Sequence, residues 1–501
     1  MRSSSDKQDK QALWRKLKNK QADSASDMLT GPDGIGESDD AFSTIRDKQI
    51  DIEVDHKGQR RKLILSLTWP SLAENLFSSF MSMADMIMVG SLGAYAIAAV
   101  GLVSQPKFIL MAAFMAMNVG TTALVAQNKG ARNHEGANNA LNQAIILAIV
   151  LTVVVCTAMI ILAEPLIRLI AGSELSEQTI KEALAYYRIQ IYGFPTMSLT
   201  FTINSALRGA GNTRTTFYNN TVANLVNVAL NYCLIGGNFG FPRMEVAGAS
   251  LATVIGQVVG LVMALFVILQ GKQYIRLDLR KRIKADFIMI KRIINIGIPS
   301  LAEQVLMRIG ALWFTTIVTA LGDMSYAAHM VAMNIQQLSL STGMAFGTAA
   351  TTLVGQCIGR KRIDLAKVYV RMTQMQGLVV SLAISVFMFT CGRLISSLYS
   401  SDTVILSLAA DMLKIIALVN VFMNARFIYV SALRGAGDAK FMAIITFIGM
   451  VVVRPLVGLL LVNQFNLGLT GVWIALSSDF MVSYFITMVR YRKGKWTTLE
   501  I

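Results

Sequence analysis

The sequence predicts an all-α integral membrane protein with twelve transmembrane helices in two pseudo-symmetric six-helix bundles, related as a parallel repeat. Three observations support this fold class: an apolar composition, recurring apolar stretches of spanning length, and an internal duplication. Of the 501 residues, 54% are hydrophobic and only 15% are charged. Soluble proteins carry about 25% charged residues, so a soluble enzyme is disfavoured, and a coiled coil and a disordered chain are excluded.

From Leu63 onward, apolar stretches of about 20 residues recur, each long enough to cross a bilayer core of ~30 Å. We predict twelve spans, at 63–89, 94–126, 138–163, 183–207, 215–237, 246–270, 288–320, 324–358, 367–391, 406–432, 439–462 and 468–489. Polar residues without apolar periodicity precede them, and no signal peptide is expected. The predicted parts are a disordered tail (1–62), an N-terminal lobe (63–270), a basic linker (271–287), a C-terminal lobe (288–490) and a short tail (491–501).

The formal net charge is +16, and the excess of basic residues lies in the connections between the spans. This distribution does not indicate a nucleic-acid patch. Residues 1–62 are nearly neutral, with 13 basic and 12 acidic side chains. Alternate connections hold 23 Lys and Arg on the N-terminal side of the membrane and only four on the opposite side. Because basic loops remain in the cytoplasm, we expect both termini to be cytoplasmic, in a plasma membrane, with the lipid bilayer and no nucleic acid as partner.

The internal duplication covers three sets of motifs. They are Pro-Ser-Leu-Ala-Glu (70–74 and 299–303), Leu-Val-x-Gln-x-x-Gly (124–130 and 353–359) and Ser-Ala-Leu-Arg-Gly-Ala-Gly (205–211 and 431–437). The offset is 229 for the first two and 226 for the third. Six helices are an even number, so the two copies share one orientation, with their axis along the membrane normal. Two such bundles facing one another are typical of an alternating-access carrier.

Acids within spanning helices are costly and indicate function. In the first span Glu74, Ser78, Ser82 and Asp85 step by 4, 4 and 3, which places them on one helix face. A buried carboxylate can hold a proton, a metal ion or an organic cation, but not all at once, and this competition is the basis of antiport. We therefore predict ion coupling at Asp85, Glu74 and its second-copy counterpart Glu303. The alternative is a structural ion pair, for Glu303 with Arg308; for Asp479 we favour that structural role.

The fifth span carries an amide stripe, Asn220, Asn224, Asn227 and Asn231. We predict that it forms a cavity wall near Asp85, with helix–helix hydrogen bonding as the alternative. The second copy has Arg454 and Pro455 in the comparable region, so the N-terminal lobe is the better candidate for the ion site. His329, the one histidine in a span, is a candidate proton relay or a hydrogen-bonded packing residue.

Together these features resemble the multidrug and toxic compound extrusion (MATE) family of antiporters, over residues 63–490. The resemblance is carried by the Pro70 helix ending at Asp85–Gly93, both Leu-Val-x-Gln-x-x-Gly segments, both Leu-Arg-Gly-Ala-Gly turns and Ala327–His329. It implies a coupling role for Asp85 and a polar cluster with Asn227, Asn231 and Thr253. One branch of that family also uses an acid in helix ten, where Asn424 stands here, so H⁺ is preferred over Na⁺.

We therefore expect an ion-coupled antiporter that exports organic, mostly cationic amphipathic compounds by alternating access, as a monomer without a resident cofactor or metal. Its substrate cavity is predicted at Asn224, Asn227, Asn231, Thr253, Asn424 and His329. The alternative is a lipid-linked precursor flippase of related architecture; the helix count and the acids of the first span argue against it. A channel fits the duplicated lobes less well. The sequence has no HExxH, P-loop or G-x-S-x-G motif, so an enzyme is not expected.

Overall fold

The computed structural model describes residues 52–53, 56–171, 176–277, 284–399 and 402–498, which belong to one compact unit, Ile52–Ile501. Most of the predicted tail lies outside the described residues. Its end is folded, however, because the first helix of the described residues begins at Lys57 and the Ile52 side chain is fully buried. The described part of the chain is helical and contains no strand.

The N-lobe consists of the first six long helices. These are α3 (Lys57–Gly90), α4 (Ala94–Gly130), α5 (His134–Ala171), α6 (Glu177–Gly209), α7 (Thr213–Gly236) and α8 (Glu245–Leu269), with a short 3₁₀ turn, η3 (Asn238–Gly240). The C-lobe repeats the unit. It contains α9 (Phe287–Thr319), α10 (Asp323–Gly359), α11 (Ile363–Ser396), α12 (Thr403–Gly435), α13 (Ala439–Thr446), η4 (Phe447–Val453), α14 (Arg454–Asn463) and α15 (Gly468–Arg492), followed by η5 (Lys495–Thr498).

Each predicted span coincides with a helical segment of this order, which confirms the all-α membrane fold. One difference concerns the span predicted at 439–462, which the structure divides into α13, the π-helix η4 and α14. Pro455 explains the break, because it has no N–H to donate to the preceding turn and its ring crowds that turn. A wider π-turn accommodates this loss.

Eight helical stretches among the described residues are long and apolar enough to cross a membrane. The lobe helices outside that set are α3, α6, α7 and α10, which contain 34, 33, 24 and 37 residues. They are long enough to span but carry more polar side chains. Polar groups in a membrane helix need protein partners, so these four helices are the ones expected to face the interior.

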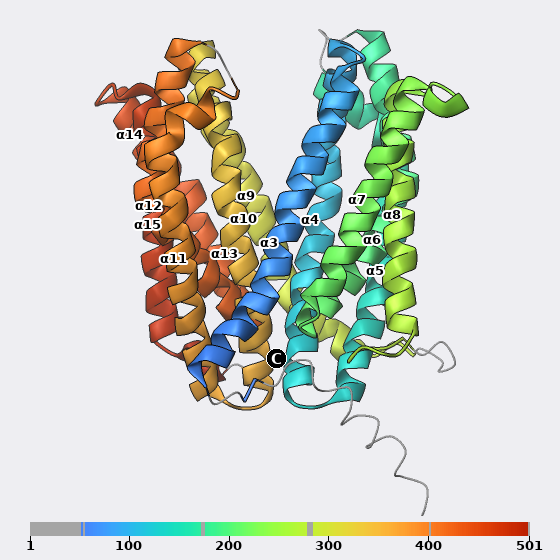
Figure 1. Ribbon diagram of the computed structural model, residues 1–501, viewed down its shortest axis with the longest axis vertical. Helices are drawn as coiled ribbons and strands as arrows, with labels where there is room; N and C mark the ends of the chain where they lie inside the picture. The colour runs from blue at the N-terminus through green and yellow to red at the C-terminus, as the bar shows by residue number, and fades with distance from the viewer. Residues whose placement is uncertain (1–51, 54–55, 172–175, 278–283, 400–401, 499–501) are drawn as a thin grey trace, which may run out of the picture. The chain divides into compact units, whose positions relative to one another are not determined.

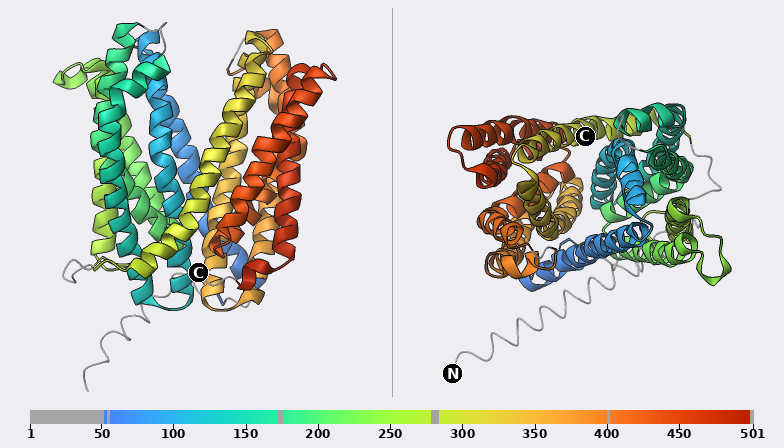
Figure 2. Two further views of the ribbon diagram at one scale, coloured as in Figure 1. Left: turned by 180° about the vertical axis from the view of Figure 1, so that it is seen from behind. Right: turned by 90° about the horizontal axis from the view of Figure 1, so that it is seen from above.

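The first helix of each copy begins against the opposite lobe. At the start of α3, the Ile52 carbonyl accepts a hydrogen bond from Tyr369 Oη of α11 at 2.8 Å. At the start of α9, Asn139 Nδ2 of α5 donates to Asp286 Oδ2 at 2.6 Å, and Ile293 is buried in the N-lobe core. Figures 1 and 2 show α3 and α9 running diagonally between the lobes. The two lobes are therefore joined by crossed helices.

The lobes also meet through the duplicated motifs, at the end of the bundle that carries the Lys/Arg-rich connections. We call this the basic end. Gln127 Nε2 of α4 donates to the Gly435 carbonyl at 3.1 Å, and Gln356 Nε2 of α10 donates to the Gly209 carbonyl at 3.3 Å. The ribbons of the two lobes lie together here and diverge toward the other end (Figures 1 and 2). The same two motifs thus make a reciprocal contact between lobes.

Glycines in these motifs permit the close approach. A Cβ atom on Gly130 would overlap the Gln356 backbone, and one on Gly359 would overlap the Gln127 backbone of the other lobe. Gly211 and Gly437 adopt φ values of 82° and 90°, in the left-handed region that favours glycine. The motif glycines are therefore explained by lobe contact and by turn geometry.

Candidate functional site

The polar stripes of α3 and α7 pair with each other in register. Asn220 Nδ2 donates to Glu74 Oε1, Asn224 Nδ2 donates to Ser78 Oγ at 3.4 Å, and Asn231 Nδ2 donates to Asp85 Oδ1 at 2.7 Å. The partners are 146 residues apart in every pair. Both helices start at the basic end and carry polar residues at matching intervals, so the two stripes form one continuous contact.

Asp85 lies toward the outer end of this contact, within a cluster from three helices. With its amide nitrogen turned toward Asp85, Asn227 donates to the two carboxylate oxygens at 3.0 and 3.1 Å. In that orientation the Asn227 oxygen accepts from Thr253 Oγ1 of α8 at 3.2 Å. Asn227 and Asn231 are buried, whereas Asp85 is half-buried. The structure thus brings Asp85 together with Asn227, Asn231 and Thr253, around a carboxylate held by neutral amides.

Lys107 of α4 is a basic neighbour of this cluster, and its charge acts on Asp85. The sequence shows Lys107 as a charge within a span but gives no signal of what it faces. One turn further along α4, a hollow between α4 and α6 is lined largely by methionine and phenylalanine. Its lining includes Met111, Phe114, Met115, Phe194 and Met197. A carboxylate and a lysine therefore lie near each other in the N-lobe.

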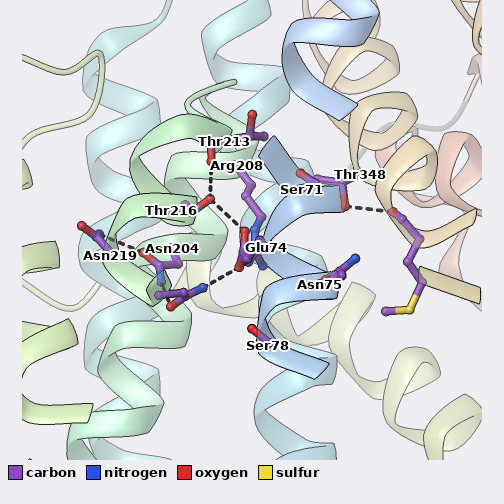
Figure 3. A network of polar contacts seen from close by, with 12 residues as sticks. Ser71, Glu74, Asn75, Ser78, Asn204, Arg208, Thr213, Thr216, Asn219 and Thr348 are labelled. Atoms are coloured by element: carbon purple, nitrogen blue, oxygen red, sulfur yellow. Dashed lines mark hydrogen bonds and ion pairs between the residues drawn. The ribbon is translucent and has the colours of Figure 1, made fainter. Parts of the chain in front are cut away.

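Glu74 is neutralised by an arginine from the duplicated turn (Figure 3). Arg208 Nη2 and Asn220 Nδ2 both donate to Glu74 Oε1, while Thr216 Oγ1 lies 3.4 Å from Oε2. The C-lobe repeats the arrangement. Arg434 Nη2 donates to Glu303 Oε2 at 2.6 Å, and Thr446 Oγ1 lies 3.5 Å from Oε1. We call these pairs, Glu74–Arg208 and Glu303–Arg434, the two Glu–Arg ties.

The ion-pair partner that the sequence suggested for Glu303 was Arg308 and not Arg434. Arg308, one turn away along the same helix, instead places its guanidinium over the Phe108 ring of α4, 4.3 Å from the centroid. A sequence signal for the true partner did exist, because the glutamates and the arginines both belong to duplicated motifs. Residues duplicated together at matching positions are candidates for contact in each copy.

The remaining predicted residues lie in the C-lobe, apart from the Asp85 cluster. His329 of α10 lies between the Phe314 and Trp473 rings, with centroid distances of 5.6 and 5.7 Å. Asn424 of α12 donates to Asn420 Oδ1 at 2.9 Å and to Ser339 Oγ at 3.3 Å. The predicted cavity residues therefore divide between the lobes, with Asn224 beside Ser78 in the N-lobe and Asn424 and His329 in the C-lobe.

Asp479 of α15 has the arginine partner that the sequence favours for a structural acid. Arg454 Nη2 donates to Asp479 Oδ2 at 2.5 Å, and Ser483 Oγ donates to Oδ1 at 3.0 Å. The Asp479 carboxylate is 2% exposed, so the pair is shielded from solvent. Among the described residues, four acids of the predicted spans are buried or half-buried, and three of these (Glu74, Glu303 and Asp479) are paired with arginine.

A duplicated six-helix membrane fold, with its lobes joined at one end and acids buried in each, defines a polytopic membrane transporter. A family profile described as MatE matches residues 70–233 and 299–460, which is more than half of the chain. The chain therefore belongs to the MatE family of multidrug efflux transporters, as the motifs suggested, and it is a transporter and not an enzyme. The comparisons do not support the flippase alternative.

Known proteins can be aligned with this chain over most of its length. A "Probable multidrug resistance protein NorM" of Thermotoga maritima is 29% identical over 438 residues, covering 87% of this chain and 93% of its own length. An "Uncharacterized transporter YisQ" of Bacillus subtilis is 26% identical over 435 residues, covering 86% and 94%. A solved outward-facing conformation of a multidrug resistance MATE family transporter has a TM-score of 0.81 at 23% identity, covering 88% and 97%. That structure supports the fold.

Proposed function

We propose that this protein is a proton-coupled antiporter that exports organic, mostly cationic amphipathic compounds, and that Asp85 is its coupling residue. One observation carries the proposal: Asp85 is held by the amides of Asn231 and Asn227, whereas the three buried span acids are paired with arginine. A carboxylate neutralised by arginine has little remaining attraction for another cation. A carboxylate held by neutral donors can exchange a proton for a cation.

In the proposed cycle, a proton and a cationic compound compete for Asp85. Protonation removes the negative charge and with it the attraction for the bound compound, which is released on the outer side. Loss of the proton inside restores the charge, and Lys107 partly offsets it until the next compound binds.

Alternating access requires the lobes to separate at the basic end. We propose that this end faces the cytoplasm of a plasma-membrane monomer with both termini inside, which makes the present arrangement outward-facing. Within it, Glu74 and Glu303 hold the turns that accept the interlobe hydrogen bonds, and we assign them this role in preference to ion coupling. Protease-cleavable tags at the two termini, protected in right-side-out vesicles, would support the orientation.

The test is dye efflux from proteoliposomes under an imposed pH gradient or an imposed Na⁺ gradient, applied separately. The pH gradient should drive export, and Asp85→Asn should reduce it to the level of empty liposomes. Asp411→Asn is the matched control, because Asp411 is an exposed acid of α12 paired with Lys414 at 2.9 Å. Export driven only by Na⁺ would contradict proton coupling, and full export by Asp85→Asn would contradict the role of Asp85.

A further inference from the structure

Arg426 of α12 is a buried cation without a hydrogen-bond acceptor among the described residues. It is 8% exposed, its buried Nε has no partner, and its guanidinium carbon lies 5.7 Å from the centroid of the Phe427 ring. A guanidinium carries five N–H donors and stays charged in proteins. A charge with little access to water is costly unless an opposite charge compensates it. Arg426 therefore requires an explanation.

The neighbouring charges leave Arg426 uncompensated. The charges that act on it are those of two acids and two further arginines, Asp479, Glu303, Arg434 and Arg454. Each acid is already paired with one of those arginines, Glu303 with Arg434 at 2.6 Å and Asp479 with Arg454 at 2.5 Å. The charges within each of these two ion pairs cancel, so the positive charge of Arg426 remains. The interior of the C-lobe thus holds one positive charge in excess.

Further polar atoms in this interior have no partner among the described residues. The Arg454 Nε donor is free, and its guanidinium lies over the Phe314 and Phe480 rings at 5.2 and 5.8 Å. On α15, Trp473 Nε1 and Ser477 Oγ also lack partners, at 0% and 5% exposure. Trp473 and Ser477 are one turn apart, so they lie on one face of the helix. A buried water could satisfy such donors, but water does not neutralise the surplus charge.

The backbone beside this cluster is also unusual. The π-helix η4 ends at Val453, immediately before Arg454, and π-turns occur frequently at functional sites. Within η4, Gly449 lies so close to the Asp479 carboxylate that a Cβ atom would overlap it. The backbone at Gly449 thus packs directly against the Asp479 carboxylate, which is the group that binds Arg454.

We propose that the C-lobe contains a binding site for a small monovalent anion, a carboxylate group or a halide, between Arg426, Arg454 and Trp473. Guanidinium forks match the geometry of a carboxylate and also bind a halide as a point charge. The indole N–H adds a neutral donor. The bound anion neutralises the positive charge of Arg426, because Asp479 is already paired with Arg454. This site goes beyond the proposed cation antiport and does not depend on it.

Binding is measured with the purified full chain in nanodiscs, by thermal unfolding at constant ionic strength. Sodium methanesulfonate, a larger and weakly coordinating anion, is replaced stepwise by sodium chloride or sodium acetate. We expect saturating chloride or acetate to raise the unfolding temperature by about 2–4 °C. A rise with acetate alone identifies a carboxylate site, one with chloride alone identifies a halide site, and either result supports the proposal.

Arg426→Gln should weaken the anion dependence at least tenfold, whereas Arg393→Gln, an exposed arginine at the end of α11 in the same lobe, should leave it unchanged. No anion-dependent shift in the unaltered protein, or an undiminished shift in Arg426→Gln, would overturn the proposal. Should Arg426→Gln not fold, crystals of the unaltered protein are grown in bromide and, separately, in a bromine-labelled carboxylate. An anomalous peak within hydrogen-bond reach of Arg426 in either crystal supports the site, and the absence of a peak from both refutes it.

Asp85→Asn separates this proposal from the proposed function. That variant should lose gradient-driven export while keeping the full anion-dependent shift, because Asp85 belongs to the other lobe. A failure of proton coupling would therefore leave the anion site standing, and a failure of anion binding would leave Asp85 as the coupling residue.

Discussion

The two lobes share one six-helix unit, but Asp85 in the N-lobe and Asp479 in the C-lobe are held by different kinds of partner. In the N-lobe, Asp85 is held by the amides of Asn231 and Asn227. In the C-lobe, Asp479 is held by the guanidinium of Arg454, and Arg426 adds a positive charge without forming an ion pair with an acid of the described residues. Yet both lobes keep a Glu–Arg tie and a glutamine contact at the basic end. The duplicated parts are those that join the lobes, whereas the interiors have diverged in charge.

The largest effect should come from one substitution made in each lobe. Asp479→Asn leaves Arg454 unpaired in a buried site, which should lower the free energy of unfolding by about 3–5 kcal/mol. Asp85→Asn should change it by less than about 1 kcal/mol, because an amide can still hydrogen-bond to Asn231 and Asn227. Thermal unfolding of the two purified variants beside the unaltered protein measures the difference. Equal losses in the two lobes would show that Asp85 and Asp479 do not differ in their contribution to stability.

The Glu–Arg ties should behave alike in both lobes. Glu74→Gln and Glu303→Gln each leave an arginine without its acid. Because Arg208 and Arg434 are 24% and 22% exposed, each loss should be about 2 kcal/mol, below that of a fully buried pair. Unfolding of the single variants checks the values. The double variant Glu74→Gln/Arg208→Gln should recover part of the loss, and strict additivity would show that the tie contributes no coupling.

The glutamine contacts should control which end is open. Gln127→Ala or Gln356→Ala removes one interlobe hydrogen bond worth about 1 kcal/mol, which shifts the ratio of the two states by about fivefold. Spin labels at the exposed positions 132 and 361 would report a larger population of separated lobes. Asn128→Ala is the matched control, because the Asn128 amide bonds to Leu124 within its own helix. An equal shift in that control would argue against a specific contact.

The smallest effect concerns the starts of α3 and α9. Asp286 caps α9 through the backbone N–H groups of Ile288 and Met289, whereas His56, the residue before α3, makes no side-chain cap. The Met289 N–H and the Asn139 amide hold the pKa of Asp286 below its ordinary value of 3.8. The stabilisation is therefore present above pH 3.8 and is lost as the pH falls through the lower folded-state pKa.

Asp286→Ala should therefore cost about 1 kcal/mol at neutral pH. The difference from the unaltered protein should shrink as the pH falls below 4 and the wild-type carboxylate becomes protonated. Unfolding temperatures measured from pH 7 down to pH 3 follow this change. A difference that stays constant over that range would show that the charge of Asp286 is irrelevant to the cap.

Much of the fold could be predicted from local chain properties. Hydrophobicity over about 20 residues locates a span, and the duplicated motifs identify the repeat, without knowledge of any contact. The face shared by Glu74, Ser78 and Asp85 also follows from helical spacing alone. The sequence could not show that the π-helix interrupts the eleventh span, because Pro455 is compatible with a simple kink as well.

Within the candidate site, the sequence determined which side chains lie on one helix face, because helical periodicity is a property of the chain itself. The tertiary structure decided which faces meet. It set the register of α3 against α7, gave Glu303 its partner Arg434 in place of Arg308, and placed Lys107 near Asp85. It also left Arg426 without an acid. The charge partners lie on helices more than 130 residues apart in the Glu–Arg ties, so only packing could select them.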